Sequence, residues 1–321
     1  MLMIPERPSD CTLKALELFC GMGGLSSGFA KTGFKVRGVD ISEKVGRTFS
    51  SNKFGTFVKK DLMKSGIRGR FDVVIGGPPC QPWSCLNLTR RGSKHPLYGC
   101  LDAFFREVLK LKPNAFVMEN VPALKKDPSF SMNLEAVGKR YDTIARTFRY
   151  SDYGAAFARR RLFVVGIKKK AGRSASDIVD SMRKEKSMTV RQKIEDLRGK
   201  NPDPAIDHVW PSLKTIHKYL NYYRSGKYGW YILDWDSASP SFGNITKTYI
   251  LHPDSFKNGN GARPISVREA LRIIGFEDEY KFPIGLDMKA KYEMLAAAVS
   301  PVFSLKLATA LRESLLSLSN R

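Results

Sequence analysis

The sequence predicts an α/β protein with a doubly wound, mostly parallel sheet and a second, smaller domain. Short apolar runs alternate with amphipathic stretches between residues 14 and 167. A glycine-rich turn follows the first apolar run, and acidic residues stand at the ends of later runs. Strands and helices that alternate at this spacing are typical of parallel sheets covered by helices on both faces.

Five apolar runs are expected to form the strands of this sheet: residues 14–19, 35–40, 71–77, 114–120 and 160–167. The helices expected between them cover residues 25–31, 42–52 and 101–112, with Ser42 as the N-cap of the second. In parallel sheets, ligands bind beyond the carboxyl ends of the strands. One crevice is therefore expected to collect the segments at such ends: residues 19–24, Asp40, residues 76–80 and Glu119.

The alternating pattern weakens in the second part of the chain. Residues 189–197 are expected to form a helix, whereas residues 198–262 hold scattered Trp, Tyr and Pro with little periodicity. Helical periodicity returns at residues 266–276 and in a last helix from about Lys289, which would pack back on the sheet. The predicted division is a large domain of residues 1–197 and 263–321 and a small domain of residues 198–262.

Composition narrows the class of protein. The chain has 321 residues, enough for one large domain and a smaller one. Its five cysteines are odd in number and lack CxxC spacing, which argues against a disulfide framework or a metal site and favours a reducing compartment. The first residues carry acids, and no run reaches the roughly 20 apolar residues of a membrane span. We expect a soluble intracellular protein without a membrane partner.

The net charge of +23 points to a polyanionic partner. Residues 51–200 hold 32 of the 54 basic residues and 14 of the 31 acidic ones, so the excess is concentrated in one part of the chain. Lysine-rich solvated faces are the alternative explanation. Nucleic acid is favoured over an anionic membrane, because no basic amphipathic helix with a broad apolar face stands out.

The stretch "LFCGMGG", residues 18–24, predicts a binding turn between a strand and a helix. Such a turn lets backbone N–H groups approach a polar ligand, although it is also a common tight β–α connection. The Lys-Ser/Thr pair of a phosphate-binding loop is missing. Asp40, at the end of the next strand, suits a ribose diol, and Asp61 could hold an adenine amino group or merely cap a turn. These features favour a nucleoside-bearing cofactor.

The stretch "GGPPCQPWSC", residues 76–85, predicts a rigid loop that presents Cys80 at a strand end. A free thiol is mostly protonated at neutral pH, so a nucleophilic cysteine needs cationic neighbours, which residues 159–161 (Arg-Arg-Arg) could supply. Glu119 could reach the same crevice as an acid. The four histidines are scattered and are interpreted as surface or structural residues, which argues against hydrolases of the Cys–His kind.

Six sequence blocks together resemble the conserved motifs of the DNA cytosine-C5 methyltransferases. The blocks follow in order and spacing: "LELFCGMGGLSSGF", "GGPPCQPWS", "MENV", "RRRLFVVG", "RPISVREALRIIGF" and "AAAVSP". The resemblance covers residues 14–167 and 263–311, and the Pro-Cys-Gln block with Glu-Asn-Val about 40 residues later is its most specific part. It implies a Rossmann-like class I methyltransferase fold, in which residues 198–262 form the target-recognition domain.

The resemblance also implies a mechanism. Cys80 would add to C6 of a cytosine flipped out of the duplex, and Glu119 would hydrogen-bond its N3. Arg161, helped by Arg159, would contact the base O2. Residues 84–99 would close over the base. Cys85 would lie on this loop and be replaceable by serine.

The implied cofactor is S-adenosyl-L-methionine, which delivers the methyl group. The residues matching the cofactor-binding positions are Phe19, Gly21, Met22, Gly23, Gly24, Leu25, Asp40, Ile41, Asp61, Leu62, Pro79, Leu101, Ala297 and Val299. The implied setting is a monomer in the prokaryotic cytoplasm, associated with the nucleoid and acting on double-stranded DNA. In a restriction-modification system, an endonuclease acting on the same site would be a further partner. The small domain would read bases, with Tyr222, Tyr223, Arg224, Lys227 and residues 243–249 as candidates, although the aromatic residues among them suit a domain core equally well.

Several positions depart from the family pattern. Ala156 and Phe157 stand where Pro-Gln is usual, which removes a polar group near the active site, and Ala296-Ala297 replaces Gly-Asn. Tyr98-Gly99 stands where Arg-Gly is usual, and Asp40 where Glu is usual. Two alternatives therefore remain beside an active DNA methyltransferase: a tRNA cytosine-C5 methyltransferase, and a catalytically weakened DNA-binding regulatory subunit.

Overall fold

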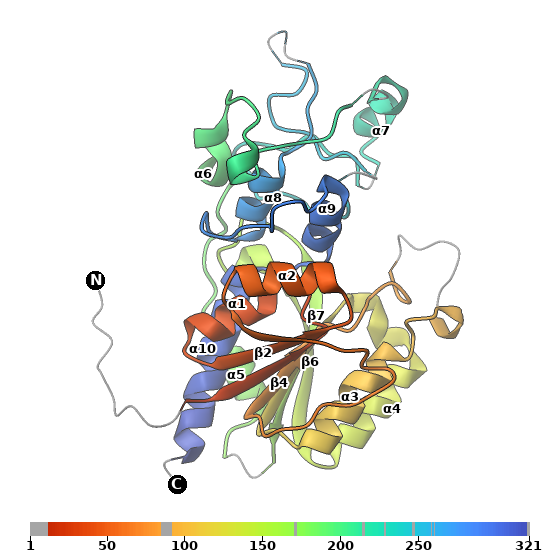
Figure 1. Cartoon of the computed structure of the whole chain (residues 1–321), viewed down its shortest axis with the longest axis vertical. Coiled ribbons are helices and arrows are strands. Elements are labelled where there is room, and N and C mark those ends of the chain that lie inside the picture. Colours follow the sequence, from red (N-terminus) through yellow and green to blue (C-terminus); the bar gives the residue numbers. More distant parts are fainter. Residues whose placement is uncertain are drawn as a thin grey trace, which may run out of the picture.

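The computed structural model describes residues 12–84, 92–169, 172–213, 216–227, 229–245, 248–257, 259 and 261–319. A seven-stranded sheet forms the centre of the larger part (Figure 1), with the strand order β3-β2-β1-β4-β5-β7-β6. Its strands are β1 (Lys14–Leu18), β2 (Lys35–Asp40), β3 (Gly55–Lys59), β4 (Val73–Gly76), β5 (Ala115–Asn120), β6 (Tyr141–Arg149) and β7 (Arg160–Lys168). Strands β1 to β5 pair in parallel, and β7 pairs antiparallel with both β5 and β6. The predicted doubly wound, mostly parallel sheet is confirmed.

Two strands were not expected from the sequence. Strand β3 lies at one edge of the sheet and is mostly exposed, so it lacks the apolar run of a buried strand. Strand β6 lies at the other edge, where half-buried polar residues interrupt its apolar ones. Edge strands bury less surface than central ones, and their sequence signal is correspondingly weak.

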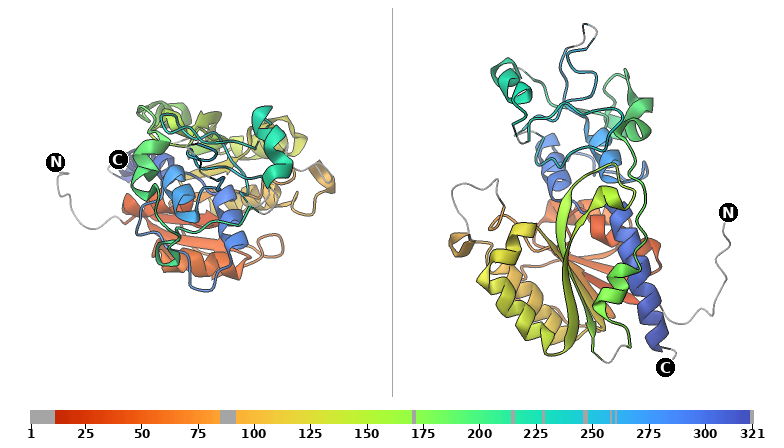
Figure 2. Two further views of the ribbon diagram at one scale, coloured as in Figure 1. Left: turned by 90° about the horizontal axis from the view of Figure 1, so that it is seen from above. Right: turned by 180° about the vertical axis from the view of Figure 1, so that it is seen from behind.

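Helices cover both faces of the sheet (Figure 2). Alternate residues of each strand point to opposite faces, as Ala15 and Leu16 illustrate by packing into separate cores. One face carries α1 (Gly24–Lys31), α2 (Glu43–Ser51), α5 (Ala175–Asp180) and α10 (Pro301–Ser319). The other carries α3 (Cys100–Leu111) and α4 (Pro128–Gly138). The expected N-cap is confirmed, because the Ser42 hydroxyl accepts a hydrogen bond from the amide of Val45.

The expected last helix is two helices, α9 (Met288–Ala297) and α10, bent by 42° at residues 298–300. Pro301 begins α10, and a proline has no N–H and disfavours helical geometry in the residue before it. Helix α10 packs on α1, and its Phe303 also contacts Phe163 of β7, so the chain end packs back on the sheet as expected. No single helix among the described residues is long and apolar enough to cross a membrane, although α9 and α10 together would pass by length and composition.

The smaller part, formed by the described residues of 198–262, lies beyond α8 (Val267–Ile274) and α9 in Figure 1 and holds short helices and loops, among them α7 (Leu220–Arg224). Helix α6 (Val190–Ile194) precedes this part along the chain and falls within the helix expected at residues 189–197. Buried Trp230, Leu233, Trp235 and Ile250 contribute to its interior. Trp230 stacks on Tyr219, with ring centroids 4.5 Å apart. Aromatic and aliphatic side chains thus fill the interior of this part, which has little regular secondary structure.

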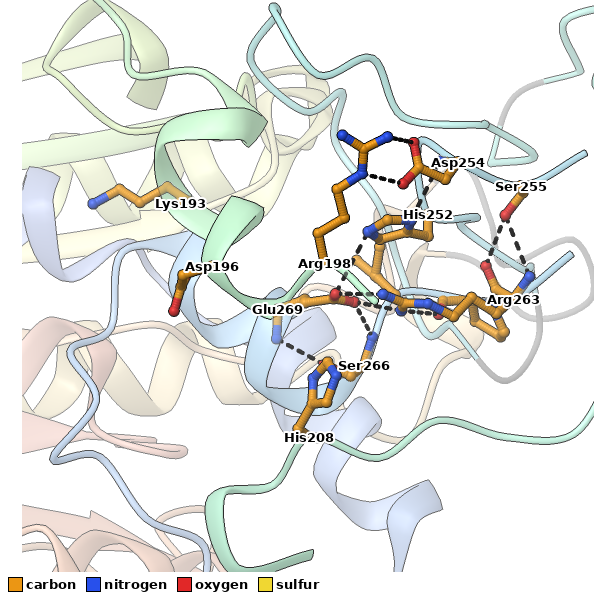
Figure 3. Close-up of polar contacts among 12 residues, drawn as sticks. Lys193, Asp196, Arg198, His208, His252, Asp254, Ser255, Arg263, Ser266 and Glu269 are labelled. Atoms are coloured by element: carbon orange, nitrogen blue, oxygen red, sulfur yellow. Dashed lines mark hydrogen bonds and ion pairs between the residues drawn. The ribbon is translucent and has the colours of Figure 1, made fainter. Parts of the chain in front are cut away.

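A partly buried ion network joins α8 to the loops of the smaller part (Figure 3). Both oxygens of Glu269 accept hydrogen bonds from Arg263, at 2.8 and 2.7 Å. His252 Nε2 lies 3.7 Å from the same carboxylate, and Arg198 pairs with Asp254 at 2.7 Å. Burial alone would raise the pKa of Glu269, but the Arg263 hydrogen bonds hold it below its usual value. His252 is thus structural, as interpreted from the sequence.

Candidate active site

A cavity of about 400 Å³ lies at the carboxyl ends of β1, β2, β4 and β5. Helix α9 and the segment before β7 complete its wall. Fourteen of the predicted site residues line it: Phe19, Gly21, Met22, Gly24, Leu25, Asp40, Ile41, Pro79, Cys80, Glu119, Arg159, Arg161, Ala297 and Val299. The crevice expected from the strand ends therefore exists in the fold, and it lies within the size range of small-molecule sites.

Glycine is required in the turn after β1 for two physical reasons. Gly21 and Gly23 have φ values of 51° and 85°, which side-chain-bearing residues rarely adopt. A Cβ on Gly24 would lie 2.3 Å from the carbonyl oxygen of Val299, so the start of α1 can approach the α9–α10 connection only without a side chain. The turn consequently leaves its backbone accessible from the cavity.

Asp40 braces this glycine turn. Its carboxylate accepts hydrogen bonds from the Gly21 amide at 3.2 Å and from the Ser42 amide at 3.0 Å. Burial raises the pKa of Asp40 above its ordinary value, although these backbone hydrogen bonds oppose the rise. A carboxylate has about four lone-pair positions, so Asp40 can hold the turn and still accept hydroxyl groups from a ligand.

Four predicted cofactor residues do not line the cavity: Gly23, Asp61, Leu62 and Leu101. Asp61 accepts a hydrogen bond from the Met63 amide at 2.9 Å, as a turn-capping residue does. Leu62 and Leu101 are buried in the core under α3. A Cβ on Gly23 would meet the ring of Phe54, so this glycine serves the packing of the turn.

The loop that carries Cys80 is held from the neighbouring strand β5. The Asn120 side chain donates to the Pro78 carbonyl oxygen at 3.0 Å, and its own oxygen accepts from the Val121 amide at 2.8 Å. A Cβ on Gly77 would lie 2.9 Å from Glu119 Oε2, so the loop passes close to this carboxylate. Asn120 was given no role in the sequence analysis, although it belongs to the Glu-Asn-Val block that carries the resemblance.

Glu119 and Arg161 form an ion pair at the cavity wall, with Nε and Oε1 2.9 Å apart. Burial raises the pKa of Glu119 although Arg161 opposes the rise. Burial also raises the pKa of the Cys80 thiol, against the lowering effect of Arg161, while Glu119 adds to the rise. Of residues 159–161, only Arg161 contributes to the pKa of Cys80, and Arg160 is exposed. The expected field that lowers the thiol pKa is thus outweighed by burial.

Arg159 lies deeper in the same wall. Its side chain is 4 % exposed and donates from Nη2 to the Ala296 carbonyl oxygen at 2.6 Å. Its Nε and Nη1 atoms have no hydrogen-bond partner within the described part of the chain. Because buried donors are normally satisfied, these two groups favour a ligand with acceptor atoms in the cavity.

The structure describes only the two ends of the expected closing loop, because residues 85–91, including Cys85, lie outside the described residues. The Gly92 amide donates to the Pro82 carbonyl oxygen at 2.9 Å and brings these ends together. Trp83 and Tyr98 both donate to the carboxylate of Asp127 at 2.7 Å. Tyr98, which departs from the family pattern, therefore anchors the base of the loop.

Glu17 is a cavity residue that was not expected from the sequence. It lies on β1, is almost fully buried and accepts a hydrogen bond from the Ser26 hydroxyl. Burial raises its pKa to about 8, against the hydrogen bonds from Ser26. The sequence feature that could have indicated Glu17 as a site residue is its position as an acid inside an otherwise apolar strand. Three further cavity residues of α9, Ala290, Glu293 and Met294, were not predicted because they precede the "AAAVSP" block, which begins only at the end of that helix.

Comparison with known protein families identifies one family for this chain. Residues 13–313 match the family described as C-5 cytosine-specific DNA methylase. The type II methyltransferase M.FnuDI of Fusobacterium nucleatum is 27% identical over 94% of this chain and 95% of its own length. The type II methyltransferase M.NgoPII of Neisseria gonorrhoeae is 29% identical over 94% of this chain and 96% of its own length.

Two solved structures share the fold. The S. pombe Dnmt2 methyltransferase superposes with a TM-score of 0.73 at 15% identity, covering 96% of this chain and all of that one (100%). The Entamoeba histolytica methyltransferase EhMeth superposes with a TM-score of 0.71 at 18% identity, covering 96% of this chain and 99% of that one. At these identities the likeness concerns the architecture alone.

Proposed function

The chain belongs to the C-5 cytosine-specific DNA methylase family and is a DNA cytosine-5 methyltransferase, and from this premise we propose a sequence-specific reaction through a covalent Cys80–C6 intermediate. The observation that carries the proposal is the convergence of Cys80, Glu119 and Arg161 on one cavity. A nucleophile, an acid and a cation meet there, with the acid and the cation 2.9 Å apart. In nucleophilic addition to a pyrimidine, the nucleophile forms the new bond, and the acid and the cation stabilise the charge that develops.

Cys80 acts as the nucleophile in this mechanism. Its sulfur bonds to C6 of the cytosine, and the electron pair of the C5–C6 double bond makes C5 nucleophilic. Glu119 in its protonated form donates a hydrogen bond to N3, where negative charge develops, and its raised pKa favours that form. After C5 is methylated, a base removes the C5 proton, the electron pair of that C–H bond re-forms the C5–C6 double bond, and the Cys80–C6 bond breaks to release the thiolate.

The three groups are coupled through charge. While Glu119 is ionised, it shares Arg161 with Cys80 and raises the pKa of the thiol. When N3 of the cytosine accepts a hydrogen bond from protonated Glu119, the Glu119 carboxyl carries no charge. Arg161 then acts mainly on the Cys80 sulfur, and the thiolate form is favoured. We therefore expect the Cys80 thiol to ionise mainly after the target base enters the cavity, and the two pKa values to belong to the pair.

The cavity fits S-adenosyl-L-methionine, which supplies the methyl group when bound. The turn of Gly21 to Gly24 exposes its backbone to the cavity, and Asp40 retains free lone pairs for the ribose hydroxyls. Phe19, Ile41 and Val299 add apolar surface to the same wall. The two unpartnered groups of Arg159 and the side chain of Arg161 are suited to the acceptor atoms of the cytosine.

The proposed substrate is double-stranded DNA with the target cytosine flipped out, because a base inside the duplex cannot reach Cys80. Residues 1–197 with 263–321 would form the catalytic domain, and residues 198–262 would recognise the target sequence. The net charge of +23 supports binding to the phosphate backbone. We further propose a monomer in the prokaryotic cytoplasm, close to the nucleoid, which protects sites cut by a cognate restriction endonuclease.

The test is methyl transfer itself. Bisulfite sequencing of DNA from cells that express the protein would report the base and the sequence together, and a fixed context around converted cytosines is expected. DNA containing 5-fluorocytosine should form an adduct with the wild-type protein that survives denaturation. The same adduct in the Cys80→Ala variant would contradict the covalent mechanism.

A further inference from the structure

The segment before the catalytic arginines pairs with the smaller part of the molecule. The Ser239 amide donates to the Ala156 carbonyl oxygen at 2.9 Å, and the Ala158 amide donates to the Ser239 carbonyl oxygen at 2.8 Å. These two bonds form a parallel bridge centred on Phe157 and Ser239. The two segments are far apart in the chain, so this bridge is a tertiary contact between the predicted domains.

Aromatic packing strengthens the same contact. The rings of Phe157 and Phe242 have centroids 4.6 Å apart, and both side chains are buried. This geometry is within the range of favourable aromatic pairs. Phe157 stands where the family pattern has a polar Gln, and its ring packs against the smaller part.

Phe157 also contacts Arg159. The guanidinium carbon of Arg159 lies 5.8 Å from the centroid of the Phe157 ring. The guanidinium is also held through the bond to the Ala296 carbonyl oxygen at 2.6 Å. The ring and the carbonyl are thus the two fixed contacts of a side chain whose remaining donors have no partner in the described structure.

The same stretch of backbone continues into Arg161. Side chains two residues apart in extended backbone lie on the same side, and both Arg159 and Arg161 line the cavity. A displacement of Phe157 would therefore move Arg159 directly and Arg161 through the backbone. Arg161 in turn is bonded to Glu119 at 2.9 Å.

We propose that Phe157 is a positioning residue that, together with Phe242, couples the seating of DNA on the smaller part to the placement of Arg159 and Arg161. This inference rests on the proposed function. DNA bound by the smaller part would hold residues 239–242 in one position. Through the contact of Phe242 with Phe157, it would also hold the side chains of Arg159 and Arg161 in place. The ring pair thus holds the arginine segment by apolar packing, where a Gln at position 157 would hold it by hydrogen bonding.

The test compares Phe157→Leu and Phe242→Leu with a matched control, Phe130→Leu. Phe130 is also buried but belongs to the core beneath α4, away from the cavity. For each variant, steady-state methylation of duplex DNA gives kcat and KM, calorimetry gives the affinity for S-adenosylmethionine, and thermal unfolding gives Tm. The control measures how much a Phe-to-Leu cavity elsewhere in the core changes Tm and kcat.

We expect Phe157→Leu and Phe242→Leu to lower kcat about 10-fold or more, because a small misplacement of catalytic groups is costly. Their cofactor affinity and KM for DNA should stay near wild type, and the double variant should lose no more than the larger single loss. The control should lower Tm by a similar amount with kcat unchanged.

Wild-type kcat in either variant, or a loss of cofactor affinity that parallels the loss of kcat, would overturn the inference. A wild-type protein that methylates no cytosine in DNA would instead overturn the proposed function, so the two failures are distinguishable.

Discussion

Arg161 Nε lies 2.9 Å from Glu119 Oε1, and only 12 % and 11 % of the two side chains are exposed. The buried guanidinium of Arg161 thus interacts with two acidic groups, the Glu119 carboxyl and the Cys80 thiol, whose pKa it lowers. Burial raises the pKa of both acids, and each would be better stabilised by Arg161 if the other were neutral. Because of this competition, a ligand that changes the protonation of Glu119 also changes the pKa of Cys80.

Replacing either partner should change the reactivity of Cys80 in opposite directions. Glu119→Gln removes the negative charge that raises the thiol pKa, so alkylation of Cys80 by iodoacetamide should become faster near pH 8. Arg161→Ala removes the charge that lowers the pKa, so alkylation should become slower. Peptide mass spectrometry resolves Cys80 from the other cysteines. Equal rates in the two variants would contradict the coupling.

The nucleophile prediction separates two neighbouring cysteines. Cys80→Ser should lower methyl transfer by at least about 1000-fold, because loss of a covalent nucleophile removes the main reaction path. Cys85→Ser is the matched control and should keep transfer near the wild-type rate. Transfer of labelled methyl groups from S-adenosylmethionine to duplex DNA measures both. Substantial activity in the Cys80 variant would remove the basis of the mechanism.

Gly77→Ala tests the close passage of the Cys80 loop past Glu119. A Cβ at this position would lie 2.9 Å from Oε2, so the Glu119 carboxylate would have to shift relative to Arg161. We expect kcat to fall about 10-fold or more, with the free energy of unfolding changed by about 1–3 kcal/mol.

Gly138→Ala is the control for this substitution. A Cβ at Gly138, the last residue of α4, would meet nothing within 4 Å. This substitution should leave kcat unchanged and stabilise the protein by about 0.5–1 kcal/mol. If both alanine variants kept full activity, the steric account of Gly77 would be wrong.

Glu17 gives a prediction for stability against pH. Its pKa is about 8 in the folded protein and 4.5 in the reference state, so the folded state binds the proton more tightly. The contribution of this group to stability therefore falls as the pH rises from about 4.5 to about 8, with a limiting slope of about 1.4 kcal/mol per pH unit. Above that window the loss is complete.

Glu17→Gln removes this titration while it keeps an acceptor for Ser26. Urea unfolding at pH 5 and pH 8 should show the variant gaining free energy of unfolding relative to wild type as the pH rises. The difference in free energy of unfolding between variant and wild type at a single pH depends also on packing. The change in that difference between pH 5 and pH 8 depends on the ionisation of the Glu17 carboxyl. A constant difference would show that Glu17 is ionised throughout.

Local pattern was enough to predict most of the sheet and its binding edge. Apolar runs, the glycine turn and the Ser42 cap each depend on residues close together in the chain, so they can be read from the chain itself. The strand ends that carry Asp40 and Glu119 followed from the same pattern, since parallel strands share one carboxyl edge. Strands β3 and β6 were missed because edge strands have a weak apolar signal.

Contacts between distant segments decided the rest. The placement of Asp61, Leu62 and Leu101 outside the cavity depends on how α3 packs on the sheet. The ion pair of Arg161 with Glu119, and the meeting of Phe157 with Phe242, depend on side-chain directions fixed by tertiary packing. The sequence alone thus predicted five of the seven strands, the candidate site residues and their common edge. Only the folded structure decided which of these residues form ion pairs, because the energy of an ion pair depends on distance and burial rather than on sequence spacing.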